Sequence, residues 1–383
     1  MKRRIFDETH DAFRAVARSF VQREVLPNLA RWDEAGVVDR DLWRKAGEVG
    51  LLGLGIEECY GGSATADYRY HVVWNEELAR AGTLSPALNL HSEVVGGCLD
   101  RFCTPEQKRR WLPGLCAGTS IWTMAITEPA AGSDVAAIQT TARRDGEEYV
   151  VNGQKAFVSH GTVADFVVVL ARLATGEGPA GTGPPQAVLL VVDTGASDVT
   201  IGRKEAKIGL RSLDTVPLFL QDTRVPATHR LGEEGFGFLY LLDTLARERL
   251  SISVSALAFA ERLYEETVEH CHRRRVYGAP LCELQHVRFT LAELATELAA
   301  ARAFTDACII EHNEGELSTE EASMVKWWNT ELCGRVADRC LQLHGGMGYS
   351  SDLLVGRAFV DSRAQRIYGG STETLKEVIG QSI

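Results

Sequence analysis

The stretch Ile126-Thr-Glu-Pro-Ala-Ala-Gly-Ser-Asp134 organises the rest of the chain. An apolar run over residues 121–126 predicts a strand that leads into it. Pro129 lacks an N–H and keeps the preceding residue extended, so we expect the strand to end there. The small residues that follow allow backbone amides to approach a ligand, and exposed amides at such a turn suit a phosphate. The stretch predicts an anion-binding turn, with an ordinary Pro-Gly loop as the alternative.

The composition restricts the class of protein. A chain of 383 residues exceeds one hydrophobic core and indicates two or three domains. The net charge of −11 argues against nucleic acid or an anionic membrane surface as a partner. No run has the length and apolar character of a transmembrane helix, and the first residues lack the apolar stretch of a secretion signal.

The cysteines point to a reducing compartment. The chain has nine, none of them spaced as C-x-x-C, and an odd number in a large core indicates reduced thiols. We therefore expect a cytoplasmic protein. No Cys or His spacing is typical of a zinc site, and we expect no metal.

Hydrophobic periodicity divides the chain into three parts. Residues 1–120 are predicted to form a helical domain, in which Thr104-Pro-Glu-Gln107 is a capping box. Residues 121–232 are predicted to form a β-barrel or sandwich domain, and residues 233–383 a helical bundle. The predicted bundle has three long helices and a short one from Ser371; the third long helix begins at the capping box that Ser318 opens.

Within the central part, two dipeptides predict hairpins and two apolar runs predict buried strands. The dipeptides are Asp145-Gly146 and Asn152-Gly153. The runs are residues 166–170 and 188–192. Residues 175–185 between them are rich in Gly and Pro and are expected to form a flexible loop.

A lone acid in the first bundle helix is the strongest catalytic candidate. Glu248 lies on one helical stripe of otherwise mainly apolar residues, and no cation is placed one turn from it. Its neighbours Arg247 and Arg249 point in other directions along the helix. A desolvated carboxylate has a raised pKa and is a better base near neutral pH. The alternative is a structural Glu paired with an Arg from another helix.

Two glycine-rich segments follow, His344-Gly-Gly-Met-Gly348 and Ile367-Tyr-Gly-Gly-Ser-Thr-Glu373. Such turns and helix starts attract oxyanions, although a glycine after a helix is usually only a cap. Arg273-Arg-Arg275 is either a phosphate clamp or a charged helix end, and Gln285 is equally open.

Taken together, these segments resemble the acyl-CoA dehydrogenase family. The matching motifs are Thr127-Glu-Pro-x-x-Gly-Ser-Asp134, Val151-Asn-Gly-Gln-Lys155, Arg274-x-x-Tyr-Gly278, Gln342-x-His-Gly-Gly-x-Gly-Tyr349 and Ile367-Tyr-Gly-Gly-Ser371. The resemblance covers nearly the whole chain. It implies an α+β protein with an N-terminal helical domain, a central β domain and a C-terminal four-helix bundle, and FAD as the cofactor.

One position departs from the usual pattern of the family. Many members carry the catalytic Glu directly after the Tyr of the last motif, where this chain has Gly369. The chain is similar in this respect to the long-chain and isovaleryl branches, which carry the base in a Glu-Arg pair on the first bundle helix. Glu248-Arg249 matches that pair. A relocated base and an inactive enzyme are the two interpretations.

The resemblance also implies a mechanism and a set of site residues. Glu248 would remove the α-proton of an acyl-CoA thioester, and a hydride would pass from the β-carbon to flavin N5, giving a trans-2-enoyl-CoA. The residues implied for FAD are Met124, Ile126, Thr127, Gly132, Ser133, Phe157, Ser159, Arg274, Tyr277, Gln285, Gln342, Gly345, Gly346, Ser371 and Glu373. Those implied for the substrate are Ser133, Arg249, Tyr368 and Gly369.

The family further implies a homotetramer, or a homodimer, and an electron transfer flavoprotein as the electron acceptor. Three alternatives stay open at this point. The chain could act on acyl groups carried by an acyl carrier protein, it could be a non-catalytic FAD-binding partner subunit, or it could react with oxygen. The sequence does not define the length of the acyl chain.

Overall fold

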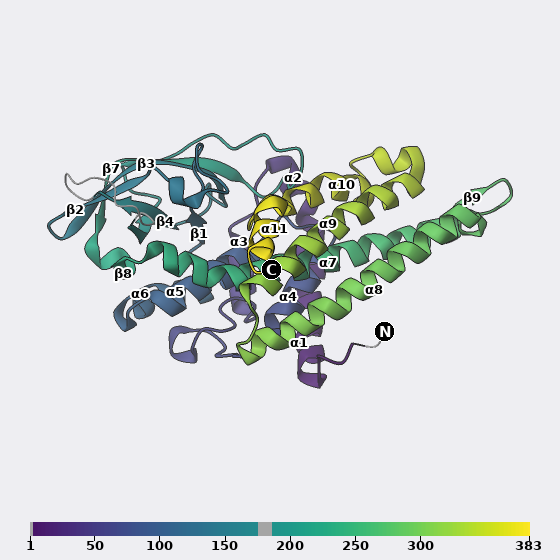
Figure 1. The fold of residues 1–383 in the computed structure, drawn as a ribbon, viewed down its shortest axis with the longest axis horizontal. Coiled ribbons are helices and arrows are strands. Elements are labelled where there is room, and N and C mark those ends of the chain that lie inside the picture. Colours follow the sequence, from purple (N-terminus) through teal and green to yellow (C-terminus); the bar gives the residue numbers. More distant parts are fainter. Residues whose placement is uncertain (1–2, 175–185) are drawn as a thin grey trace.

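A computed structural model describes residues 3–174 and 186–383. Figure 1 shows helices at both ends of the chain packed together, with the strands of the central part of the chain gathered at one end of an elongated molecule. The order is helical, then β, then helical, as the sequence predicts. The predicted loop at 175–185 lies outside the described residues.

The N-terminal part is built from helices that pack around buried tryptophans, among them Trp32, Trp43 and Trp74. Thr104 accepts a hydrogen bond from Gln107 N, and the Gln107 side chain accepts from Thr104 N, so the predicted capping box is present. The α- and π-helices are α1 (Glu8–Phe20), the π-helical segment η1 (Val21–Val25), α2 (Leu29–Ala35), α3 (Asp41–Glu48), α4 (Arg69–Arg80), the π-helical segment η4 (Leu90–Val95), α5 (Gly96–Phe102) and α6 (Pro105–Cys116).

The central strands form one connected sheet of eight strands in the order β6-β7-β3-β2-β4-β5-β8, with β1 parallel to β4. The bounds are β1 (Trp122–Ala125), β2 (Thr141–Asp145), β3 (Glu148–Ser159), β4 (Phe166–Leu173), β5 (Ala187–Asp193), β6 (Val199–Ile201), β7 (Thr215–Pro226) and β8 (Arg230–Gly235).

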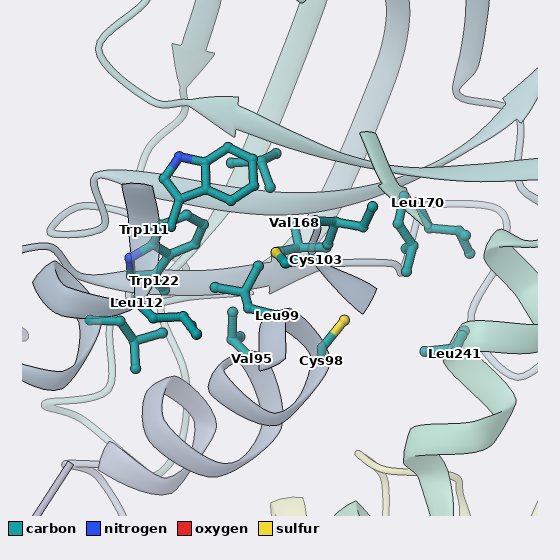
Figure 2. Packing of buried hydrophobic residues seen from close by; sticks show 14 of the residues in the cluster. Val95, Cys98, Leu99, Cys103, Trp111, Leu112, Trp122, Val168, Leu170 and Leu241 are labelled. Carbon is teal, nitrogen blue, oxygen red and sulfur yellow. The ribbon is translucent and has the colours of Figure 1, made fainter. Parts of the chain in front are cut away.

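The apolar runs predicted as buried strands are β4 and β5, and both of their faces are covered. Val167 and Val169 face a core inside the β domain. Val168 and Leu170 face helices α5 and α6 and the start of the first bundle helix, as Figure 2 shows. This two-sided burial explains why these strands are continuously apolar rather than alternating.

One of the two predicted hairpins is wrong. Asp145-Gly146 does join β2 to β3, and Gly146 has φ +62°. Asn152-Gly153 instead lies within β3, at an irregularity in its pairing with β7. The Asn152 side chain bonds to Asp222 across the strands, and the missing side chain of Gly153 leaves room for Thr140. The dipeptide therefore marks a bulge and not a turn.

The C-terminal part contains the three long helices that the sequence predicts, α7 (Gly237–Arg273), α8 (Gln285–Glu314) and α9 (Thr319–His344). The short helix α11 (Thr372–Gly380) begins at its N-cap Ser371, and α9 at its capping-box residue Ser318. A short hairpin, β9 (Arg275–Val276) with β10 (Ala279–Pro280), joins α7 to α8.

The prediction of one short helix was incomplete, because α10 (Leu354–Gln365) also belongs to this part. Val355 and Ala358 of α10 pack into the core that α7, α8 and α9 share. The rest of its buried face is polar, with Asp361, Ser362 and Gln365. This helix therefore shows no apolar period in the sequence.

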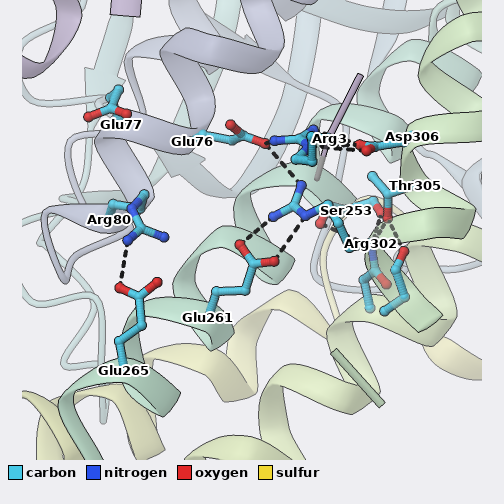
Figure 3. Close-up of polar contacts among 12 residues, drawn as sticks. Arg3, Glu76, Glu77, Arg80, Ser253, Glu261, Glu265, Arg302, Thr305 and Asp306 are labelled. Atoms are coloured by element: carbon cyan, nitrogen blue, oxygen red, sulfur yellow. Dashed lines mark hydrogen bonds and ion pairs between the residues drawn. The ribbon is translucent and has the colours of Figure 1, made fainter. Parts of the chain in front are cut away.

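A partly buried ionic network ties the N-terminal segment to the bundle (Figure 3). Arg302 of α8 pairs with Glu76 of α4 at 2.9 Å and also with Glu261 of α7. Arg3 joins the same network through Glu76 and Asp306. None of the helices in residues 3–174 and 186–383 combines the length and the hydrophobicity that a membrane-spanning segment needs.

Candidate active site

The candidate base stands on α7 in the stripe that the sequence predicts. Leu241, Ile252, Phe259 and Leu263 of this stripe are buried, while Glu248 is half-buried. Among residues 3–174 and 186–383, no cation lies within 4 Å of the Glu248 carboxylate. The alternative of a structural ion pair to another helix is therefore not seen.

Gly369 lies directly opposite this carboxylate. A Cβ atom built on Gly369 would be 3.7 Å from Glu248 Oε1 and would collide with Ile252 Cδ1. A side chain at position 369 and the side chain of Glu248 therefore point into the same space. The carboxylate of Glu248 thus reaches, from a different element of the fold, the space toward which a side chain at position 369 would project.

The turn that carries Gly369 depends on two glycines. Gly369 has φ +64° and Gly370 φ +91°, in the left-handed region that other residues avoid. The N–H of Gly369 has no hydrogen-bond acceptor among the residues that the structure describes. The turn thus presents a free backbone donor close to the Glu248 carboxylate.

Two buried residues of α9 contact the segments that carry Gly369 and Glu248. Lys326 Nζ donates to the carbonyl of Gly370 at 2.7 Å. Ser323, one helical turn earlier, accepts a hydrogen bond from Arg249 NH1 at 2.9 Å. Arg249 itself is buried, and it lies behind the turn, because its NH2 is 3.9 Å from the Cβ position of Gly370.

The electrostatic surroundings raise the pKa of the Glu248 carboxyl above its ordinary value. Burial is the main cause; the charges of Arg249 and Lys326 oppose the rise and that of Glu93 adds to it. Burial in turn lowers the pKa of Lys326 to about 8, against the attraction of Glu248. A carboxylate tuned upward in this way suits a base that works near neutral pH.

A first group of the residues implied for FAD comes together in the β domain. Met124, Ile126 and Thr127 follow or end β1, and Phe157 and Ser159 end β3. The backbone joins the two segments, because Ala156 N donates to Thr127 O and Thr123 Oγ1 to Ser159 O. All five side chains are half-buried or exposed, although residues between them are buried.

A buried ion pair fixes the turn between these segments. Lys155 Nζ donates to Glu128 Oε1 at 2.8 Å and to Ile126 O at 3.0 Å. Glu128 also accepts a hydrogen bond from Thr140 N. Both side chains of the pair are buried, so the turn after β1 is held rigidly to β3.

The exposed atoms beside this turn leave room for a flat cofactor. Phe157 has φ +56° and is 64% exposed, a strained conformation for a bulky residue that suggests a functional constraint. Nothing lies within 4 Å of a Cβ atom built on Gly132, and Ser133 beside it is exposed. An open glycine, a free hydroxyl and an aromatic wall fit the phosphates and ring of FAD.

A second group lies at the far end of the bundle. The rings of His270 and His344 stack at 4.0 Å, so the ends of α7 and α9 are adjacent. Figure 1 shows the β9 hairpin far from the β domain. The exposed residues at this end are Arg274, Tyr277, Gln285, Gln342, Gly345 and Gly346. One chain therefore does not bring this group to the first group.

A third group, Ser371 and Glu373, starts α11 directly after the Gly369 turn. Ser371 accepts from Thr374 N as a helix cap, and Glu373 is exposed. Tyr368 lies on the same turn and is half-exposed, with 40% of its surface accessible.

Known proteins are similar to this chain over its whole length. Family models for the N-terminal, middle and C-terminal domains of acyl-CoA dehydrogenases match residues 7–119, 123–223 and 235–383. The mitochondrial long-chain specific acyl-CoA dehydrogenase of Sus scrofa is 41% identical over 382 residues, covering 100% of this chain and 88% of that protein. The chain belongs to the acyl-CoA dehydrogenase family.

Solved structures agree with this assignment. An acyl-CoA dehydrogenase from Geobacillus kaustophilus has a TM-score of 0.95 and 41% identity, with 100% of this chain and 99% of that chain covered. A glutaryl-CoA dehydrogenase from Mycobacterium smegmatis in complex with FADH2 has a TM-score of 0.90 and 26% identity, with 99% and 95% covered. The predicted three-domain fold is confirmed.

The predicted class of activity is confirmed as well. This acyl-CoA dehydrogenase is an FAD-dependent oxidoreductase of acyl-CoA thioesters, of the kind that serves fatty-acid β-oxidation. Within the described ranges no group of three or more His, Cys, Asp or Glu residues could hold a metal ion.

Sequence reasoning missed Lys326, although a signal for it was present. Residues 322, 326, 329, 333 and 336 of α9 repeat at helical spacing, and all five are fully buried. Lys326 is a lone charge on that stripe, as Glu248 is on α7. The sequence therefore marks Lys326 as unusual in the same way as it marks Glu248.

Proposed function

We propose that Glu248 is the base that removes the α-proton of an acyl-CoA thioester during its oxidation to the trans-2-enoyl-CoA. The observation that carries this role is the position of Glu248 Oε1, 3.7 Å from where a Gly369 side chain would begin. The other two of the three heavy atoms nearest to that position belong to Ile252, so Glu248 supplies the carboxylate nearest to it.

The reaction divides into tasks that residues of this chain can perform. The α-carbon loses its proton to Glu248 while a carbon–carbon double bond forms toward the β-carbon. Negative charge gathers on the thioester oxygen, and the free N–H of Gly369 is placed to donate to it. Bound FAD supplies the acceptor for the hydride that leaves the β-carbon.

Arg249 and Tyr368 would line the substrate beside Glu248, and Ser133 would reach both the cofactor and the CoA moiety. Arg249 is already engaged with Ser323, so we propose that it orients the base and the turn more than it binds the acyl group. Tyr368 is half-exposed, as a wall of a substrate site would be.

We propose that FAD is held by the first and third groups of one chain together with the second group of another copy. The separation of the two ends of the molecule supports this division. It also supports a homo-oligomer, a tetramer or a dimer. Exposed aromatic residues at the bundle end, with Tyr277 98% and Tyr349 86% exposed, are suited to such an interface.

Other expectations remain proposals. We propose domain limits of 1–120, 121–232 and 233–383, an electron transfer flavoprotein as the electron acceptor, and a cytoplasmic location. The location is supported by the nine cysteines, all of which are free.

The experiment that tests this function is anaerobic mixing of the FAD-loaded protein with a panel of straight, branched and ring-bearing acyl-CoAs. We expect bleaching of the oxidised flavin and one equivalent of the enoyl-CoA for at least one of them. The same acyl groups on a carrier protein should react more slowly, and air should reoxidise the reduced flavin slowly. A flavin that no thioester reduces would contradict the proposal.

A further inference from the structure

Lys326 is the only lysine of the bundle whose side chain is buried without a carboxylate partner in the part of the chain that the structure describes. Its side chain is 0% exposed. Its one hydrogen bond to a described residue, at 2.7 Å, goes to the carbonyl of Gly370. Burying an ammonium group costs free energy, so a fold that keeps one there invites a functional explanation.

The hydrogen bond from Lys326 acts on the Gly369–Gly370 turn, which is the most flexible part of the site by sequence. Gly369 and Gly370 both have positive φ, and consecutive glycines lose more conformational freedom on folding than other residues. The carbonyl of Gly370 accepts no backbone hydrogen bond from the described residues, so it would lose its donor if Lys326 were absent, and such a loss is unfavourable. The hydrogen bond from Lys326 to the Gly370 carbonyl therefore holds a turn whose two glycines would otherwise be flexible.

The hydrogen bond of Lys326 is one of two contacts that α9 makes with the site. On the same face of α9, Ser323 accepts from Arg249, the residue next to Glu248. One helix thus fixes both the segment that carries the base and the turn that faces it. The 3.7 Å spacing between Glu248 Oε1 and the Cβ position of Gly369 lies between the two segments that these contacts attach to α9.

We infer that Lys326 is a positioning residue for removal of the α-proton: its bond to the Gly370 carbonyl holds the Gly369–Gly370 turn against the Glu248 carboxylate. The inference rests on the proposed function. A proton transfer needs the base within hydrogen-bond reach of the carbon acid, and small displacements lower its rate steeply.

The charge of Lys326 gives the role a signature that packing alone lacks. It is one of the two cations that act on Glu248, with Arg249, and it lowers the pKa of that carboxyl. The charged groups acting on Lys326 are Glu248 and Arg249 of α7 and Glu331 of its own helix. Removing the ammonium should therefore raise the pKa of the base further.

The test uses the FAD-loaded full-length enzyme and measures the rate constant of anaerobic flavin reduction by a saturating acyl-CoA, from pH 5 to pH 9. Lys326→Met removes both donor and charge, Lys326→Gln keeps a donor, and Lys326→Arg keeps both. Thr330→Val is the matched control, because Thr330 is buried one turn further along α9 and bonds only within its helix.

In Lys326→Met we expect the rate constant of flavin reduction to fall by a factor of roughly ten or more. We also expect the acidic limb of its pH profile to move to higher pH by roughly half a pH unit or more. Lys326→Gln should show the same shift with a smaller loss, and Lys326→Arg and Thr330→Val should keep the wild-type limb. If Lys326→Met does not fold, the Gln variant decides.

An unshifted limb and a wild-type rate in the Met variant, or in the Gln variant where Met fails, would overturn the inference. A lower yield of folded protein together with an unchanged acidic limb of the pH profile would give Lys326 a purely structural role, and this result would also overturn the inference. Failure of the proposed function gives a different result. In that case acyl-CoA would not reduce the flavin of the wild-type enzyme, or it would still reduce the flavin of Glu248→Gln.

Discussion

The β domain and the bundle each place a glutamate near a fully buried lysine, but the two regions use these residue types in opposite ways. In the β domain, Lys155 contacts Glu128 directly at 2.8 Å. In the bundle, Lys326 contacts a backbone carbonyl and leaves Glu248 without a direct partner. Each lysine holds a turn of the site by donating to a carbonyl, but only one of them neutralises its glutamate.

The pKa values of the two glutamates diverge for this reason. Burial pushes the pKa of Glu128 up, but hydrogen bonds from Lys155, Thr140 and Gln139 hold it below its ordinary value. Burial raises the pKa of Glu248, and the cations near it only moderate the rise. A satisfied carboxylate serves the fold, whereas an unsatisfied one next to a substrate site can take a proton.

The largest effect on stability should come from Lys155→Met. It leaves Glu128 buried without its cation, which costs about 3–5 kcal/mol in comparable cases. Lys326→Met should cost only about 1–2 kcal/mol, the price of one buried hydrogen bond. Urea unfolding of the two variants, side by side, measures the difference. Equal losses in both would mean that the two pairs are equivalent.

The pH dependence of the reaction should follow the bundle pair. Because the folded-state pKa of Glu248 is raised, the base is protonated at a higher pH than a free glutamate, and the rate should fall about tenfold per pH unit below that pKa. The ion pair of Glu128 contributes stability above pH 4.5 that is lost only as pH falls through its lowered pKa.

As the pH is lowered, the rate of flavin reduction should therefore fall at a higher pH than the thermal stability of the enzyme does. Activity should decline while the enzyme is still folded. Coincident loss of both, in measurements on the same samples, would show that unfolding and not protonation of the base limits activity at low pH.

A smaller effect should follow from Gly369→Ala. The new Cβ would collide with Ile252 Cδ1, the flexible end of a side chain, so we expect the turn and the base to separate slightly and the reduction rate to fall by roughly tenfold. Gly315→Ala is the matched control, with φ +77° and nothing within 4 Å. It should lose about 1 kcal/mol of stability and no activity. Full activity in Gly369→Ala would contradict the tight opposition of the two positions.

Much of the fold was predictable because periodicity, caps and turn residues agree locally. The three long helices and the two buried strands follow from such patterns. The helix α10 did not, because its buried face is largely polar, and Asn152-Gly153 was misread because a bulge and a hairpin require the same residue types.

The site was predictable to a lesser degree. Glu248 stood out as a charge on an apolar stripe, but its spacing to Gly369 is a tertiary contact that no local pattern contains. The roles of Lys155 and Lys326 are of the same kind, since each depends on a carbonyl distant in the sequence. Local sequence identifies unusual residues, and the packing of elements decides what they do.

The most direct test of the account is the rate of anaerobic flavin reduction by acyl-CoA in Glu248→Gln, with Glu261→Gln as control. Glu261 lies on the same helix but pairs with Arg302 away from the site. We predict that Glu248→Gln binds FAD normally and shows no bleaching, whereas Glu261→Gln is reduced at the wild-type rate. Reduction of Glu248→Gln at more than a few per cent of the wild-type rate would contradict the role of Glu248 as the base.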